Sequence, residues 1–169
     1  MLLTAYSQII NDNRQFMDDL VGYFYPSSIL YFPSTNIYTQ SLNFDSMVKS
    51  ASGQPVAIIN SSVRLTSSRS YSSAILDECK ADALLSLAHI APVMVAGFYK
   101  TDGTLDLYRL DEHGALRPTA MRTQKHTPVS FVNQQKVLRR LIEIPLSDCL
   151  LFTNQQRQLK LQHRLHTHR

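Results

Sequence analysis

Apolar side chains recur at helical spacing near the start of the chain and at strand spacing farther along it. Residues 4 to 24 place apolar side chains three or four positions apart, which predicts a helix, and Pro26 is expected to end it. Residues 42 to 48 and 55 to 59 are predicted to form two strands around a turn at residues 52 and 53. The chain is therefore expected to open with a helix that leads into a strand pair.

A second helix and a second strand pair are predicted in the middle of the chain. Residues 60 to 73, NSSVRLTSSRSYSS, are rich in Ser and Arg, which is typical of an exposed loop. Helical periodicity returns over residues 74 to 89, and Pro92 is expected to end this helix. Residues 92 to 99, PVMVAGFY, have the pattern of a buried strand, and residues 105 to 110 form its return strand after a Thr-Asp-Gly turn.

The last third of the chain has a weaker pattern. Residues 115 to 128 are predicted to be a polar connection, whereas residues 130 to 146 fit either a strand or a short helix. The order of elements predicts an α/β fold in which helices flank a central mixed sheet. One domain is expected over residues 1 to 152, and residues 153 to 169 are expected to be a basic C-terminal tail or helix.

Positive charge is segregated along the chain. The net charge is +4, and residues 153 to 169 contain basic but no acidic side chains. A second basic segment lies between Glu112 and Glu143 and also lacks acids. This segregation favours an anionic partner, DNA or RNA. The candidate nucleic-acid-binding residues are Arg117, Arg122, Lys125, Lys136, Arg139, Arg140, Arg157, Lys160 and Arg164.

The composition argues against membrane, secreted and zinc-dependent classes of protein. No apolar run approaches the length of about 20 residues that crosses a bilayer. The start, MLLTAYSQIINDNRQF, lacks the basic region and long apolar core of a signal peptide, so a cytoplasmic location without membrane contact is expected. Cys79 and Cys149 stand alone among apolar neighbours, which predicts two buried reduced thiols.

Residues 44 to 60 combine an acidic residue, a turn and an apolar strand. The stretch FDSMVKSASGQPVAIIN resembles the restriction-endonuclease-like PD-(D/E)XK fold, in particular the nuclease domains of type I restriction subunits and the Vsr-like endonucleases. The following stretch LDECKADALLSLAHIAPVMVAGF is similar to the helix and buried strand that come next in these families. The resemblance runs from Phe44 to about Leu110 and implies a restriction-endonuclease-like sheet.

The resemblance also implies positions for a metal site. In the family, strand-borne carboxylates hold divalent metals and a lysine assists the attacking water. Asp45 matches the first carboxylate, whereas Asn60 and Ser62 stand where the second acid and the lysine are expected. A hard cation requires negatively charged oxygens close together. The resemblance therefore implies only a weak metal site at Asp45, no cofactor, and a catalytically inactive nuclease-like domain that binds nucleic acid or assembles a complex.

Two alternatives remain open. In the first, the protein is an active Mg²⁺-dependent endonuclease in which Asp45 acts with Glu78 or Asp82, since residues four apart share a helix face. The simpler interpretation of Glu78 and Asp82 is a solvated helix face. In the second alternative the protein is a scaffold or assembly subunit that contacts only other proteins.

Aromatic residues surround Pro26, namely Tyr23, Tyr25, Tyr31 and Phe32. Aromatic rings beside basic residues can stack on nucleic-acid bases. No positive run accompanies these rings in the sequence, so packing in the core or against a protein partner is the favoured interpretation.

Overall fold

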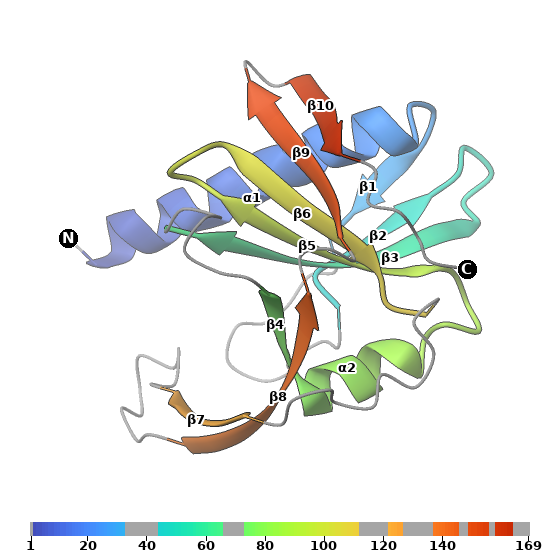
Figure 1. Cartoon of the computed structure of the whole chain (residues 1–169). Coiled ribbons are helices and arrows are strands. Elements are labelled where there is room, and N and C mark those ends of the chain that lie inside the picture. The colour runs from blue at the N-terminus through green and yellow to red at the C-terminus, as the bar shows by residue number, and fades with distance from the viewer. Residues whose placement is uncertain are drawn as a thin grey trace.

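The computed structural model describes residues 2–32, 44–65, 73–111, 122–126, 137–145, 149–155 and 158–163. The elements in chain order are α1 (Leu2–Phe24), β1 (Ile29–Tyr31), β2 (Ser46–Lys49), β3 (Pro55–Arg64), β4 (Ser73–Asp77), α2 (Glu78–Leu85), β5 (Val93–Tyr99), β6 (Thr104–Arg109), β7 (Arg122–His126), β8 (Val137–Pro145), β9 (Leu150–Gln155) and β10 (Gln158–His163) (Figure 1). No helix of these segments has both the length and the apolarity needed to span a membrane.

The main sheet is mixed and has the strand order β1-β2-β3-β5-β6-β9-β10. Its neighbouring strands run antiparallel except β3 and β5, which are parallel from the pair Ile58 and Val93 to the pair Arg64 and Tyr99. Parallel neighbours need a crossover connection, and here that connection contains β4 and α2. The predicted α/β class with a mixed sheet and helices is confirmed.

Helix α1 covers one face of the main sheet. Its buried residues are Phe16, Met17, Leu20 and Val21, which recur at helical spacing and pack against buried side chains of β2, β3, β5, β6 and β9. The ring of Phe16 stacks on that of Phe98 with centroids 5.0 Å apart. Figure 1 shows α1 running behind strands β6 and β9 of the main sheet.

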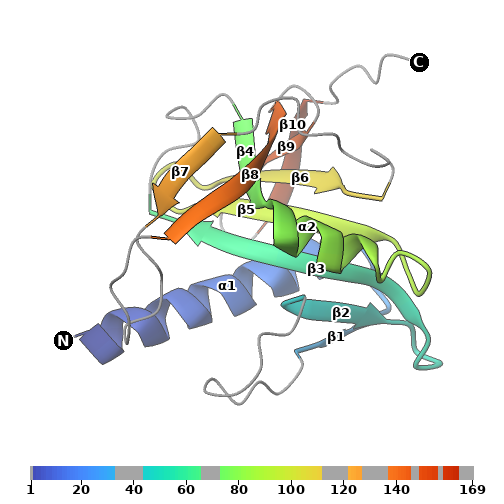
Figure 2. The same ribbon diagram turned by 90° about the horizontal axis from the view of Figure 1, so that it is seen from below.

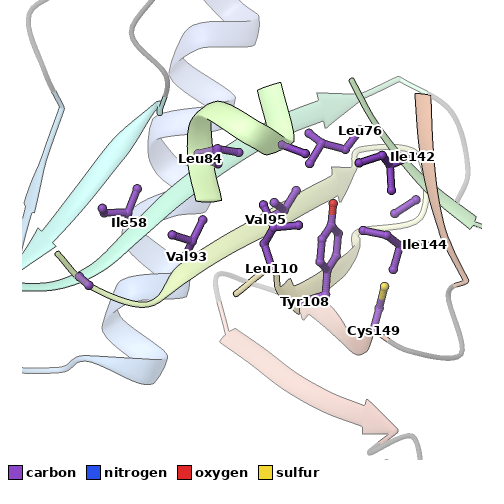
Figure 3. Close-up of a cluster of buried hydrophobic side chains, with 13 residues drawn as sticks. Ile58, Leu76, Leu84, Val93, Val95, Tyr108, Leu110, Ile142, Ile144 and Cys149 are labelled. Atoms are coloured by element: carbon purple, nitrogen blue, oxygen red, sulfur yellow. The ribbon is translucent and has the colours of Figure 1, made fainter. Parts of the chain in front are cut away.

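Helix α2 and a second sheet cover the opposite face. The second sheet has the order β4-β8-β7. Its buried side chains pack with those of α2 and of the main sheet in one cluster, which Figure 3 shows in close-up. The residues labelled there are Ile58, Leu76, Leu84, Val93, Val95, Tyr108, Leu110, Ile142, Ile144 and Cys149. Figure 2, seen from below, places α2 and the second sheet in front of β3 and β5. The described segments thus form three layers: α1, the main sheet in the middle, and α2 together with the second sheet.

The connection between β3 and β5 differs from its prediction. Residues 60 to 64 continue β3 and are not a loop, and residues 73 to 77 form β4 and do not begin a helix. Ala74 and Leu76 are buried and alternate with half-buried neighbours, as a strand requires. The helix starts only at Glu78, because the Asp77 side chain accepts a hydrogen bond from the backbone N–H of Cys79 and caps it.

Four further segments were missed or left open by the pattern. The three-residue strand β1 was not predicted, and β7 lies within the predicted polar connection. The open choice for residues 130 to 146 is settled as strand at β8. Residues 158 to 163 form β10, which pairs with β9 and is neither a helix nor a free tail. Strand β9 crosses the predicted boundary at residue 153, and the predicted loop at residues 34 to 40 lies outside the described segments.

The buried thiol prediction is half right. Cys149 is buried in the cluster between the two sheets, whereas Cys79 is exposed in the first turn of α2. The difference follows from the later start of the helix, which places Ala81 and Leu84 on its buried face. Neither cysteine forms a disulfide.

Gly97 is required by a close approach between β5 and β6. A Cβ atom at Gly97 would lie 2.1 Å from Oδ1 of Asp106, its partner in the antiparallel register. We expect Gly97→Ala to lower the free energy of unfolding by about 1–3 kcal/mol, because the buried carboxylate has to move. Chemical denaturation would measure this change.

Gly22→Ala is the matched control for this prediction. A Cβ atom at Gly22 meets nothing within 4 Å, and the residue lies in α1. Replacing a helical glycine by alanine should raise stability by about 0.5–1 kcal/mol. Equal effects of the two substitutions would contradict the assigned role of Gly97.

Candidate functional site

Asp45 is fixed at the junction of β2 and β3. It directly precedes β2, and its backbone N–H donates a hydrogen bond to the carbonyl of Ile59 at 3.2 Å. Its carboxylate Oδ2 accepts a hydrogen bond from the backbone N–H of Ser61 at 2.7 Å. A charged acceptor strengthens such a bond. The side chain therefore holds β2 to β3 at this corner of the main sheet.

Lys80 brings a positive charge from α2 to the same corner. Its Nζ lies 3.9 Å from Oδ1 of Asp45, and the two side chains are 38% and 34% exposed. At this distance and exposure the pair is a weak ion pair. The sequence prediction missed this contact, because it depends on how α2 docks against the main sheet. Lys80 stands in the stretch LDECKADALL, which by itself does not show that this lysine faces Asp45.

Asn60 and Ser62 follow on β3. Asn60 is only 4% exposed, and no hydrogen-bond partner of its Oδ1 is found among the described residues. Ile58 packs in the cluster that includes buried residues of α2. Residues two apart in a strand point to the same face, so Asn60 and Ser62 lie on the face that α2 covers. The paired register of β2 and β3 begins at Ser46 and Ile59, the residues that directly adjoin Asp45 and Asn60. The corner thus joins a carboxylate, a neutral amide and an ammonium group.

Glu78 and Asp82 do not complete a pair of carboxylates with Asp45. Glu78 binds the second sheet instead, where its Oε2 lies 3.2 Å from Nε of Arg140. Asp82 is exposed on α2. Within the described segments, no group of three or more His, Cys, Asp or Glu side chains is placed to hold a metal ion. Of the candidate acids, only Asp45 therefore contacts the corner.

The predicted basic residues lie on two separate parts of the molecule. Arg122 and Lys125 are in β7, and Arg139 and Arg140 are in β8, where Gln124 pairs with Arg139 and Thr123 with Arg140. Lys160 is exposed on β10. Figure 1 shows β7 and β8 at the bottom of the view and β10, an edge strand of the main sheet, at the top, so these segments do not form one surface. The other predicted residues, Arg117, Lys136, Arg157 and Arg164, lie outside the described segments.

A buried polar cluster lies on the same sheet face and was not predicted. Asp106 is 1% exposed, and its Oδ2 accepts a hydrogen bond from the hydroxyl of Tyr99 at 3.0 Å. The guanidinium group of Arg64 lies 5.8 Å from the centroid of the Tyr99 ring, and its Nη2 donates to the carbonyl of Ile75 on β4 at 3.4 Å. The cluster connects β3, β5 and β6 of the main sheet with β4 of the second sheet.

Burial sets the proton affinities in this cluster. It raises the pKa of Asp106 above the usual value, although the hydrogen bond from Tyr99 and the charge of Arg64 oppose this shift. Burial also raises the pKa of Tyr99, and the charge of Asp106 adds to the effect. The predicted hairpin held a signal for the cluster, since its turn fixes the register that sets Asp106 opposite Gly97.

No protein-family model, curated protein or solved structure matches the chain.

The first test concerns what holds Asp45. Asp45→Ala should lower the free energy of unfolding by about 1–3 kcal/mol, because it leaves the Ser61 N–H without its charged acceptor. Lys80→Ala should cost less than about 1 kcal/mol, since both charges of the ion pair are solvated. Urea unfolding of both variants measures the difference, and Asp82→Ala on the exposed side of α2 is the control. A loss in Lys80→Ala as large as that in Asp45→Ala would show that the ion pair holds the corner.

The second test concerns Asp106 and pH. Its pKa is higher in the folded chain than in the unfolded chain, so its contribution to stability is fully present below about pH 3.9 and is lost as pH rises through the folded pKa. Asparagine does not ionise and retains an acceptor for Tyr99. We therefore expect the stability of Asp106→Asn relative to the wild type to increase from about pH 4 to pH 8, as measured by thermal or urea unfolding.

Asp111→Asn is a control of opposite sign. Burial raises the pKa of Asp111, but hydrogen bonds from Arg109 and from the N–H of Val93 outweigh this and leave the pKa lowered. Its stabilising contribution is present above the unfolded pKa and is lost as pH falls. The stability of Asp111→Asn relative to the wild type should therefore decrease with rising pH. Parallel pH profiles for the two variants would rule out the assigned environment of Asp106.

Proposed function

We propose that the protein is a nuclease-like domain of the PD-(D/E)XK type that binds nucleic acid without cleaving it. The observation that carries the proposal is the state of the corner at Asp45. Its carboxylate is bonded to the Ser61 N–H and faces Lys80, while the neighbouring strand position is Asn60. A divalent metal would find one negative charge there, and that charge already has an internal cation.

The arrangement of elements supports the nuclease-like framework. Asp45 precedes β2 and meets residues 60 to 62 on β3, as the sequence resemblance implies for the first carboxylate and the following motif. The crossover from β3 then brings α2 over the same corner before the parallel strand β5. A framework of this kind can be retained for binding after its catalytic groups have changed, because function depends on the site and not on the fold.

The basic strand pair β7 and β8 supports an anionic partner. Arg140 has a side chain that is 62% exposed and therefore accessible to a phosphate group. Contacts of Lys and Arg with phosphates supply most of the sequence-independent affinity for nucleic acids. Glu78 competes for Arg140 in the free protein. Removing the negative charge of Glu78 should therefore strengthen binding.

One observation favours the endonuclease alternative. Lys80 places an ammonium group next to Asp45, although it comes from α2 and not from β3. In this alternative a second acid has to reach a metal beside Asp45: either Glu78 leaves Arg140, or Asp82 turns in from its exposed position on α2. Binding of a phosphate at Arg140 also displaces Glu78, but it does not require either acid to move to Asp45.

The proposal is tested by fluorescence anisotropy with labelled single- and double-stranded DNA and RNA. Affinity should fall by roughly tenfold to fortyfold between about 50 and 200 mM salt if two or three phosphates are contacted. Glu78→Gln should bind several times more tightly than the wild type, whereas Arg140→Ala should bind more weakly. Asp82→Asn removes the same charge from the exposed part of α2 and is the matched control for Glu78→Gln.

Cleavage is measured on the same substrates with Mg²⁺ or Mn²⁺. No cleavage is expected. Metal-dependent cleavage that is lost in Asp45→Ala would replace the proposal with the endonuclease alternative. Absence of any nucleic-acid affinity would instead favour a scaffold or assembly subunit.

A further inference from the structure

An exposed aromatic side chain lies at one edge of the main sheet. Strand β1 is the edge strand, and its residues Ile29 and Tyr31 are 64% and 44% exposed. They alternate with Leu30, which packs toward α1. These two large apolar side chains are exposed and lie next to each other on one face of β1. Together they form a surface that a ligand can cover.

A lysine from the neighbouring strand lies over this aromatic ring. Nζ of Lys49 is 4.5 Å from the centroid of the Tyr31 ring, within the range of a cation–π contact. The register pairs Tyr31 with Met47 and Ile29 with Lys49, so the four residues share one face of the strand pair. The sequence separates the ring from its cation by 18 positions, which is why no basic residue appeared beside the aromatic cluster.

The face that carries this ring continues to the corner of Asp45. Asp45, Met47 and Lys49 alternate along the same side of β2, and Met47 packs toward the cluster that α2 covers. At the far end of this row, Lys80 supplies the second cation, 3.9 Å from Asp45. One sheet face thus contains an exposed ring with Lys49 over it and, at the corner of Asp45, a second lysine. Asp45 is four positions from Lys49 along the chain, and Met47 lies between them.

We infer that this face is a binding surface for single-stranded nucleic acid. A base stacks on Tyr31 against Ile29, Lys49 contacts the adjoining phosphate, and the strand continues toward Lys80. The inference rests on the proposed function and names the part of the ligand that is bound. Stacking of bases on aromatic side chains beside basic groups is how single strands are bound without sequence preference.

The geometry selects unpaired bases. The faces of bases within a duplex are covered by their neighbours, so only a single strand can offer one to Tyr31. A protein strand added to β1 is disfavoured, because an edge strand of three residues offers few backbone hydrogen bonds. The cation over the ring instead complements the negative charge of a nucleotide.

The chain contains no tryptophan, which gives a direct probe of stacking. Tyr31→Trp places the sole indole at the proposed contact, and Tyr23→Trp places it on α1 at a tyrosine of similar exposure, 47%. Titration with an oligothymidine or an oligouridine should quench the emission of Tyr31→Trp and leave that of Tyr23→Trp unchanged. Hairpin duplex DNA should cause little quenching in either variant.

Affinity measurements complete the test. Tyr31→Ala and Lys49→Ala should each weaken binding of the single strand by about fivefold or more, in keeping with the contribution of one stacked base. Tyr31→Phe should bind like the wild type, because it keeps the ring, and Tyr23→Ala should also be unchanged. Thermal unfolding of each variant verifies that the fold is retained.

The outcomes separate this inference from the function on which it rests. If the wild type binds nucleic acid but Tyr31→Trp is not quenched and Tyr31→Ala binds normally, the surface is wrong while the proposed function stands. Loss of self-association in Tyr31→Ala with unchanged nucleic-acid binding would overturn the inference in favour of a protein partner at this edge. If no nucleic acid binds at any salt concentration, both fail together.

Discussion

The parallel pairing of β3 and β5 is the constraint on which the rest of the described structure depends. Two parallel neighbours cannot be joined by a tight turn, so the chain has to leave the sheet and return. That excursion carries β4 and α2 onto one face of the main sheet, opposite α1. β4 then pairs with β8 and so creates the second sheet. The position of Lys80 beside Asp45 is a consequence of the same excursion.

Three acidic residues on this side of the main sheet have different partners, and the partners determine whether the carboxylates are available to a ligand. Asp45 is bonded to a backbone N–H and lies near Lys80, and Glu78 is held by Arg140. Asp106 is buried with Tyr99 as its hydrogen-bond donor, and burial raises its pKa. Charges that are paired within the chain stabilise contacts between strands and helices. They are correspondingly less available to hold a metal ion.

This distribution of charge bears on what the molecule can bind. The corner at Asp45, with one carboxylate, an amide and a lysine, is poorly suited to bind a divalent cation. The proposed binding of an anionic polymer rests instead on the exposed Arg140 of β8 and on the ring of Tyr31 with Lys49. The two surfaces lie on elements far apart in the chain, at β1 and at β8. Binding energy for a nucleic acid would come from phosphate contacts and from stacking, and neither requires a metal.

The sequence by itself determined the elements whose signals are local. Helix α1, residues 55 to 59 of β3, strand β5, and the hairpin of β5 and β6 follow from periodicity and from a Thr-Asp-Gly turn, and the α/β class follows from their order. Tertiary structure decided the others. Residues 73 to 77 and 158 to 163 are strands because β8 and β9 supply hydrogen-bond partners that no local pattern reveals. The candidate site divides in the same way. Asp45 was proposed from a local motif, whereas Lys80 beside it and Lys49 over Tyr31 are contacts between segments remote in sequence, which come together only when the sheet and α2 pack.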